Sequence, residues 1–296
     1  MAKTKFLVSV VIPTYNLVNN LLEAIDSIRK QDYSPIEIIV VDNGSTDGTS
    51  KKIRESYSEV KLITHKKNLG VTGGRNSGLK EANGKYILFF DHDMIADKEM
   101  ISELVRVAES DREVGIVTGK IYCWDNKKKI WSAGTDVNLI TGQVFFRTGE
   151  DKGQYDCIEE IQVAPAVILV KKEVIKKIGG FDDVFFANWE DTDFCFRARK
   201  AGFKIFYTPK AIAYHKITLD PVESMNRLLS RAYYIARNRI IFMRRHSKYF
   251  RLFLLFLPIY IAYYTYLSLC FGRIDGIENF LKGTFSGLSM VKKQKI

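Results

Sequence analysis

Two carboxylates follow an apolar run, where they could hold a metal ion. Asp91, His92 and Asp93 come directly after the run Tyr86–Phe90. Five apolar or aromatic residues in succession predict a strand buried on both faces, as in a parallel sheet. Alternate residues of a strand point the same way, so Asp91 and Asp93 could approach one divalent cation that also holds a diphosphate. The alternative is an ordinary strand-end turn, where aspartate is common.

Polar residues also follow two earlier predicted strands. Val8 to Thr14 leads into the sequence Pro13-Thr14-Tyr15-Asn16, and Ile36 to Val41 ends in Asp42-Asn43-Gly44-Ser45. The Asp42 carboxylate and the Asn43 amide could meet a nucleotide base or ribose hydroxyls. Asp and Asn before glycine also form plain turns, which is the alternative.

A glycine-rich stretch, Asn68 to Gly78, runs into a predicted helix over about 72–82. Glycine lets a backbone approach a ligand closely, and a helix N-terminus favours phosphate. Arg75 adds a planar fork for phosphate oxygens. The stretch lacks the G-x-G-x-x-G spacing of a dinucleotide fingerprint, and close helix packing through small residues is the alternative.

A pair of acidic residues, Glu190 and Asp191, follows an aromatic run from Phe181 to Trp189. Such carboxylates stabilise a helix start. One of them could also act as a general base towards a hydroxyl, with aromatic rings such as Trp189 and Phe186 as a platform for a sugar. His215 closes a later strand. If it faces the metal, it favours manganese over magnesium, since imidazole suits manganese better.

Strands alternate with short helices through the first half of the chain. This order predicts right-handed βαβ units and an α/β fold with a mainly parallel, Rossmann-like sheet flanked by helices. Ligands bind beyond the carboxyl ends of such strands, so the three polar strand ends should meet in one crevice. The later strand candidates suggest a smaller, mixed part of the sheet; they are Val114 to Tyr122, Lys129 to Ala133, Gln143 to Arg147, Glu160 to Val170, Lys204 to Tyr207 and Ala211 to His215.

Composition limits the class of partner. The chain has 296 residues and a net charge of +11, which indicates an anionic partner. Its four cysteines are scattered, which argues against a zinc site or a disulfide framework and fits a reducing compartment. The first residues predict a strand rather than a signal peptide.

The excess positive charge gathers in the C-terminal part. Residues 224–251 contain eight basic and no acidic residues, with apolar residues interleaved at roughly helical spacing. This pattern predicts a basic amphipathic helix on a membrane surface; a helix packed on the domain is the alternative. Because the charge is not spread over the sheet, we expect no nucleic-acid partner.

An uncharged stretch of twenty residues follows, from Leu252 to Phe271. Its length could span a bilayer, but its tyrosines, Pro258 and the basic flanks on both sides favour a re-entrant or interfacial segment. A buried helix of a soluble protein is a third interpretation. We therefore expect two regions: a nucleotide-binding domain over 1–220, and a membrane-associated tail over 221–296.

Together these motifs resemble the family 2 inverting glycosyltransferases with the GT-A fold, in particular the rhamnosyltransferase-like branch. The matching stretches lie in order over roughly residues 8–215; they are 10–16, 40–49, 68–70, 74–78, 91–93 and 180–191. The resemblance implies a nucleotide-diphosphate sugar donor and Mn²⁺ or Mg²⁺ at Asp91 and Asp93. It implies that Asp191 is the catalytic base beside Glu190, and that inversion occurs in a single displacement.

The resemblance also implies which residues hold the donor. They are Pro13, Thr14, Tyr15, Asn16, Asp42, Asn43, Ser45, Asn68, Gly70, Gly74, Arg75, Asn76, Asp91 and His92. Many family members carry a second aspartate where this chain has Asn43, so uridine, thymidine and guanosine stay open. With a cytoplasmic, membrane-facing tail, the acceptor would be a glycan or a polyprenyl-linked glycan. A non-catalytic sugar-nucleotide-binding or scaffold protein of the same fold is the rival function.

Overall fold

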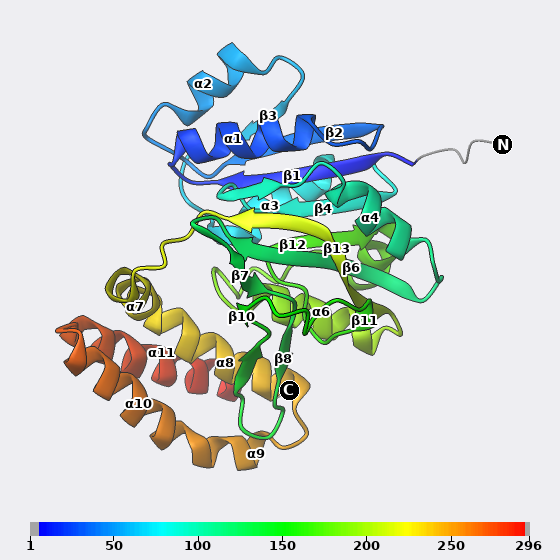
Figure 1. The fold of residues 1–296 in the computed structure, drawn as a ribbon. Coiled ribbons are helices and arrows are strands. Elements are labelled where there is room, and N and C mark those ends of the chain that lie inside the picture. The colour runs from blue at the N-terminus through cyan, green and yellow to red at the C-terminus, as the bar shows by residue number, and fades with distance from the viewer. Residues whose placement is uncertain (1–5, 294–296) are drawn as a thin grey trace.

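The computed structural model describes residues 6–293 and has a mostly parallel sheet at its centre (Figure 1). The parallel half has the strand order β3-β2-β1-β4. Its strands are β1 (Val8–Thr14), β2 (Ile36–Asp42), β3 (Lys61–Thr64) and β4 (Tyr86–Phe90). The helices between them are α1 (Val18–Arg29), α2 (Thr49–Ser56) and α3 (Gly70–Glu81). The predicted α/β alternation is confirmed.

The other half of the sheet is mixed, as predicted. β12 (Val167–Lys171) lies antiparallel between β4 and β6 (Val114–Cys123), and β13 (Lys204–His215) runs parallel to β6. The smaller strands are β5 (Met94–Ala96), β7 (Asn126–Ser132), β8 (Thr135–Val137), β9 (Val144–Phe146), β10 (Gly149–Glu150) and β11 (Glu159–Glu160). The helices here are α4 (Met100–Ala108), α5 (Lys172–Ile178) and α6 (Glu190–Lys200).

Two predicted strand boundaries are wrong, and proline explains both. The predicted strand 160–170 is two strands, because Pro165 has no N–H and Ala166 takes a left-handed φ of 58°. The two predicted strands at 204–207 and 211–215 are one strand, β13. Its register shifts between Thr208 and Ile212, where Pro209 interrupts the ladder.

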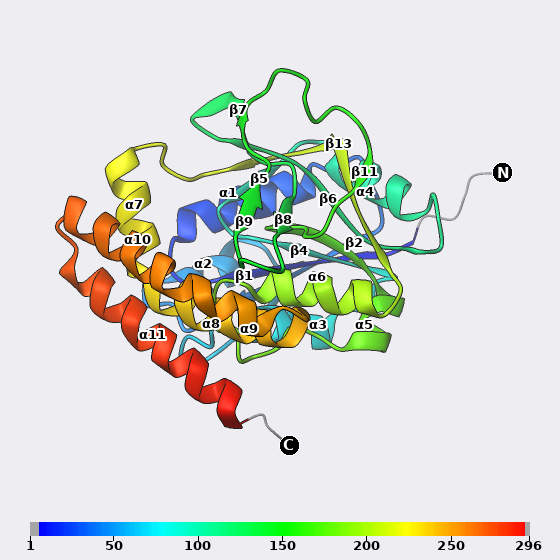
Figure 2. The ribbon, with the colours of Figure 1, turned by 90° about the horizontal axis from the view of Figure 1, so that it is seen from below.

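Within residues 6–293, five α-helices follow the sheet; they are α7 (Pro221–Ser230), α8 (Ala232–His246), α9 (Phe250–Phe253), α10 (Leu257–Cys270) and α11 (Ile274–Lys293). Figures 1 and 2 show α8, α10 and α11 side by side, and in Figure 1 they lie below the sheet. Glycine permits the close contact of α11 with α8, since a Cβ at Gly283 would lie 2.2 Å from the Tyr233 carbonyl oxygen.

Helix α8 is not the membrane-surface helix that its basic residues predicted. Ile240 and Phe242 share one hydrophobic core with Trp189 and other residues of the sheet domain. Two of its arginines, at positions 237 and 239, are more than nine-tenths buried. The charge pattern misled because Arg237 donates to the Val184 carbonyl of a loop and Arg239 lies over the Tyr260 ring, so the packed-helix alternative holds. The predicted boundary at residue 220 thus separates two segments with a common core.

The apolar segment is a helical stretch with one packed side. Among the described residues, only Phe250–Cys270 is long and apolar enough to be a candidate membrane span, with a mean hydropathy of 1.7. The Tyr260 hydroxyl donates to the Thr141 carbonyl (3.1 Å), and the Tyr264 ring stacks on Phe280 at 4.2 Å. The predicted single segment is broken into α9, a 3₁₀ turn at Leu254–Phe256, and α10.

Candidate active site

Arg75 joins three elements at the carboxyl edge of the sheet. It lies on α3, is 1% exposed, and its Nη2 donates to Asp91 Oδ1 after β4 (3.0 Å). Its Nη1 is 3.5 Å from Glu190 Oε1 at the start of α6. Nε and Nη1 make no hydrogen bond within the described part of the chain. Arg75 therefore brings the acidic strand end, the glycine-rich stretch and the acidic pair together in one place.

The glycines of α3 bring Arg75 to this position by close packing. A Cβ at Gly74 would lie 2.8 Å from Pro13 Cβ, and one at Gly70 would lie 2.4 Å from the Phe186 carbonyl oxygen. The first amides of the helix are also engaged: Val71 donates to Phe186 (2.9 Å) and Gly70 to Asn68 Oδ1 (2.8 Å). Close helix packing, the alternative, therefore accounts for these glycines, and the phosphate cradle stays a prediction.

Glu190 and Asp191 form an acidic pair at the start of α6. Burial and the neighbouring Asp191 charge raise the pKa of Glu190 to about 7, against the opposing effect of Arg75. Burial also raises the pKa of Asp191, again opposed by Arg75. Glu190 is 7% exposed, whereas Asp191 is partly exposed. Asp191 is therefore the carboxylate of the pair that a second substrate can reach.

Asp193 does not join this pair, although it follows in the same acidic run. It is fully buried and points to α8, where its Oδ1 lies 2.8 Å from His246 Nε2. Its Oδ2 accepts from Arg197 Nε (2.7 Å). Burial opposes ionisation, but the hydrogen bonds from His246 and Arg197 hold the pKa of Asp193 below its ordinary value. Asp193 therefore fixes α6 against α8.

The three predicted metal ligands lie near one another without closing around a point. His215 Nε2 is 3.3 Å from Asp93 Oδ2, and the His215 ring packs edge-on against Trp131 at 4.3 Å. Burial would raise the pKa of Asp93, but His215 holds it well below the ordinary range. Within residues 6–293, no three His, Cys, Asp or Glu side chains are grouped tightly enough to hold an ion. Two carboxylates and an imidazole nevertheless have the donor chemistry of a divalent-metal site.

Two basic residues, one on α7 and one at the junction of α7 and α8, belong to this site and were missed by the sequence analysis. Arg227 Nη2 lies 3.8 Å from Asp93 Oδ2. Burial and the Arg227 charge lower the pKa of Arg231, while the charges of Glu190, Asp93 and Asp91 raise it. Both arginines lie in the basic run that predicted a membrane surface. Their place beside an acidic site depends on the path of the chain after β13, which no local pattern predicts.

The predicted nucleoside-binding residues mainly hold turns. Asp42 is buried, and its carboxylate accepts from Ser45 N–H (2.8 Å) and from the Ser50 hydroxyl. Asn43 is also buried; its Nδ2 donates to the Gly70 carbonyl (3.1 Å) and its Oδ1 is 2.8 Å from His65 Nδ1. The plain-turn alternative therefore describes Asp42, whereas Asn43 links its turn to Gly70 and His65. The side-chain oxygens that could have read a base already have protein partners.

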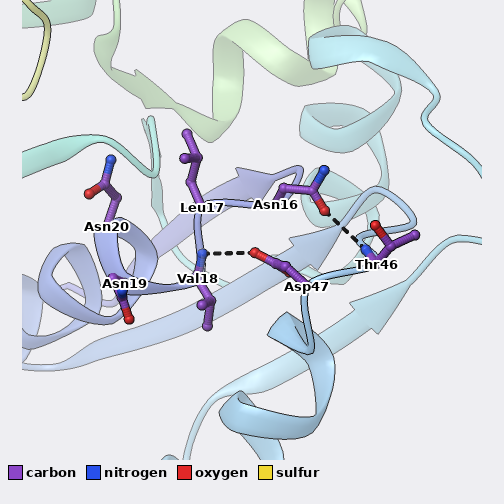
Figure 3. Close-up of a pocket in the computed structure, with 7 residues that line it drawn as sticks. All are labelled: Asn16, Leu17, Val18, Asn19, Asn20, Thr46 and Asp47. Atoms are coloured by element: carbon purple, nitrogen blue, oxygen red, sulfur yellow. Dashed lines mark hydrogen bonds between the residues drawn. The ribbon is translucent and has the colours of Figure 1, made fainter.

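A surface cavity of about 540 Å³ lies beside these turns, at the end of β1 (Figure 3). It is lined by residues 16–20, Thr46 and Asp47. Asn16 N–H donates to Ser45 Oγ (2.8 Å), and Thr46 N–H donates to Asn16 Oδ1 (3.0 Å). Asn16 thus both lines the cavity and joins the two turns. Tyr15 next to it is 44% exposed, so its ring can contact a ligand.

The predicted donor-binding residues Asn76 and His92 differ in whether their side chains already have partners in the protein. Asn76 holds the turn that contains Phe181, because its Nδ2 donates to the Phe181 carbonyl (2.8 Å) and its Oδ1 accepts from Phe181 N–H (2.9 Å). It is therefore engaged by protein. His92 Nε2 is buried and has no hydrogen-bond partner among the described residues.

The predicted aromatic platform is only partly accessible. Trp189 is 7% exposed and packs on Phe242 with ring centroids 4.9 Å apart. The ring of Phe186 is half-buried and stacks on Tyr234 at 5.3 Å. Phe186 is therefore the more exposed ring of the two.

Comparison with known sequences places the chain in a family. Residues 9–179 match the family described as Glycosyl transferase family 2, and the chain belongs to that family. The matched region contains the Arg75–Asp91 pair but ends before Glu190, Asp191 and His215. The fold and this sequence match together define a GT-A type protein of glycosyl transferase family 2.

Individual relatives agree with the family assignment. Glycosyltransferase GlyG of Streptococcus pneumoniae is 30% identical over 194 residues, which cover 62% of this chain and 60% of GlyG. Probable glycosyltransferase YdaM of Bacillus subtilis is 25% identical over 297 residues, 96% of this chain and 68% of YdaM. The chain thus spans less than two thirds of the length of GlyG.

A solved structure with the same fold is the mannosyltransferase PcManGT of Pyrobaculum calidifontis, in complex with GDP-Man and Mn²⁺. The two chains superpose with a TM-score of 0.61 at 18% identity, over 99% of this chain and 77% of PcManGT. At this identity the likeness establishes the GT-A fold.

Proposed function

We propose that this protein transfers a sugar from a nucleotide-diphosphate donor to a hydroxyl of a glycan or lipid-linked acceptor, with inversion at the anomeric carbon. The observation that carries the proposal is the buried Arg75, which holds Asp91 and Glu190 at one edge of the sheet. Family membership and the nucleotide-sugar complex of PcManGT support the same reaction class. Hexosyl and deoxyhexosyl donors both fit, the latter through the resemblance to the rhamnosyltransferase-like branch.

Asp191 acts as the general base. Its partial exposure gives an acceptor hydroxyl access, and its raised pKa makes it a stronger proton acceptor than an ordinary aspartate. Its Oδ1 accepts from Thr192 N–H (2.7 Å), which fixes the carboxylate at the helix start. As the acceptor oxygen attacks the anomeric carbon, its proton passes to Asp191 and the bond to the diphosphate breaks.

Arg75, Arg227 and Arg231 bind the diphosphate side of the donor. Arg75 keeps two guanidinium nitrogens free of hydrogen bonds, and Arg227 lies at Asp93, so positive charge surrounds the position of the leaving group. Asp91, Asp93 and His215 would hold Mn²⁺ or Mg²⁺. When bound, such an ion neutralises charge on the departing diphosphate.

A thermal-shift panel tests the donor and the metal together. We expect one class of nucleotide sugar, among uridine, thymidine and guanosine diphosphate sugars, to raise Tm in the presence of Mn²⁺. Ligand at 100 times its Kd adds about 2.7 kcal/mol to the free energy of unfolding. Asp93→Asn should lose the part of the shift that depends on Mn²⁺. A panel in which no nucleotide sugar shifts Tm, with or without metal, would contradict the donor assignment.

We further propose that the protein docks peripherally on the cytoplasmic face of the cell membrane, where a polyprenyl-linked acceptor would be presented. One face of α9 and α10 is apolar and exposed; its residues are Leu252, Leu255, Ile259, Tyr263, Tyr266 and Leu269. The opposite face carries Tyr260 and Tyr264, which are packed on the protein. A helix packed along one side on a polar body favours in-plane insertion over spanning. The amylovoran biosynthesis glycosyltransferase AmsB of Erwinia amylovora, 28% identical over 226 residues, fits an envelope polysaccharide role.

Vesicle flotation tests this surface. Leu255 and Ile259 are 70% and 62% exposed. Each buried aliphatic side chain contributes about 1.5–3 kcal/mol, so the pair Leu255→Glu/Ile259→Glu should weaken binding to phosphatidylglycerol vesicles by at least about 100-fold. Ile158→Glu, at an exposed apolar residue of the sheet domain, is the matched control and should float with the vesicles. Complete release of the wild type by salt alone would show that charge, rather than insertion, holds it.

A further inference from the structure

The turn that leads into Glu190 and Asp191 has an unfavourable backbone conformation, which contacts from another part of the chain must stabilise. Asn188 and Trp189 take left-handed φ angles of 63° and 71° in succession. This conformation is unfavourable for residues with a Cβ, and most of all for bulky ones. Trp189 is the residue immediately before α6, so its conformation decides where the first turn of that helix points. Any relaxation here would displace the acidic pair.

Asn238 of α8 supplies that support. Its side chain is fully buried, and its Nδ2 donates to the carbonyl oxygens of both Ala187 and Asn188, each at 2.8 Å. Arg237 Nε donates to Asn238 Oδ1 (2.8 Å), which fixes the amide with its nitrogen towards the turn. The Arg237 guanidinium also donates to the Val184 carbonyl. Three carbonyls of the turn are thus held by two adjacent residues of α8.

Two more contacts from α8 bracket the same segment. Phe242 packs against the Trp189 ring at 4.9 Å, and His246 pairs with Asp193 one helical turn into α6. The partners lie about fifty residues apart in the chain. In contrast, the recorded hydrogen bonds of Asn238 include none to Arg75, Asp91 or Asp93.

We propose that Asn238 is a positioning residue that holds Glu190 and Asp191 in their reactive arrangement. The kinetic side of this inference rests on the proposed function. Because Asn238 contacts the base-bearing turn and not the residues assigned to the diphosphate, its loss should affect turnover more than donor affinity.

Steady-state kinetics measures the effect on turnover, and calorimetry measures the effect on donor affinity. A displacement of about 1 Å at a reacting group can cost about 100-fold in rate, and we expect Asn238→Ala to lower kcat by about that factor. The donor Kd should stay within about threefold, since the diphosphate side is untouched. Asn238→Ser keeps one hydroxyl donor and should give an intermediate kcat, which provides a milder variant if Asn238→Ala folds poorly.

Ile241→Ala is the matched control. Ile241 is also buried on α8, it makes no side-chain hydrogen bond to the turn, and its truncation should lower Tm at least as much. We expect this variant to keep kcat within about threefold of the wild type at temperatures below its Tm. Equal losses of kcat in Ile241→Ala and Asn238→Ala would overturn the proposal.

Hydrogen–deuterium exchange gives a readout that needs no activity. In Asn238→Ala, amides of residues 184–193 should exchange faster, while those of β4 stay protected as in the wild type. If the wild type transfers no sugar, the proposed function fails and exchange alone decides the positioning role. Unchanged exchange over 184–193, or an equal increase throughout the chain, would count against it.

Discussion

Asp191→Asn is expected to abolish sugar transfer while donor binding stays nearly intact. The substitution keeps the size of the side chain and its hydrogen-bond acceptor for Thr192 N–H, but removes the proton acceptor. General-base catalysis contributes about 10²–10⁴-fold to rate, so kcat should fall by at least that range. Transfer is measured with the donor found in the thermal-shift panel, and donor binding by calorimetry.

Two variants make this test specific. Glu190→Gln changes the neighbouring carboxylate, which contacts Arg75 and is buried, so it should weaken activity less than Asp191→Asn. Asp32→Asn changes an exposed carboxylate on the loop before β2 and should match the wild type. If Asp191→Asn retained near-wild-type turnover, the base would have to be another residue.

Arg75→Met is expected to be the most destabilising single substitution in the site. Arg75 is paired with Asp91 and Glu190, and its removal leaves two carboxylates without their cation in a largely buried place. Loss of one partner of a buried ion pair costs about 3–5 kcal/mol. Urea unfolding of both proteins measures the difference, and donor binding should be lost as well.

The destabilisation by Arg75→Met should depend on pH with a definite sign. The folded-state pKa of Glu190, about 7, already exceeds its ordinary value of 4.5, so the folded state prefers the protonated form. The protonated Glu190 therefore contributes to the free energy of unfolding below pH 4.5, and this contribution is lost as the pH rises through the folded-state pKa. Without Arg75 this pKa rises further. The stability difference should therefore be larger at about pH 8 than at about pH 5.

A second substitution separates the effect of losing the Arg75–Glu190 ion pair from the effect of losing the packing of the Arg75 side chain. In Arg75→Met/Glu190→Gln the unpaired Glu190 charge is gone, so part of the stability should return while transfer stays absent. The double variant should also lose most of the pH dependence. If the stability loss of Arg75→Met is the same at both pH values, the pair with Glu190 is not its source.

Much of the fold could be predicted because its signals are local. The alternation of apolar strands with short helices predicted β1 to β4 and the edge at which their polar ends meet. Arg75, Asp91 and Glu190 do meet there, although they come from three elements. The errors at 160–170 and 204–215 arose where proline and a left-handed residue decide strand ends, and tertiary pairing sets those boundaries.

The glycine-rich stretch is a sequence pattern that fits two structures, a phosphate-binding site and a closely packed helix. Small residues before a helix fit both a phosphate and a neighbouring strand. The structure shows close packing, since Pro13 of β1 and Phe186 of the loop before α6 fill the space beside Gly74 and Gly70. Likewise, Asp42 and Asn43 are polar strand ends as predicted, but their oxygens are taken by the turn itself and by His65.

The sequence by itself determined the family, the sheet and the acidic residues at its edge, because these depend on residue type and spacing along nearby chain. Only the tertiary structure decided which polar groups pair. The basic run of α8 predicted a membrane surface, yet Arg237 and Asn238 are buried and bind the turn before Glu190. A buried polar group must find a hydrogen-bond partner, and packing chooses that partner among segments that are distant in sequence. Charge counted along a helix gives no information about that choice.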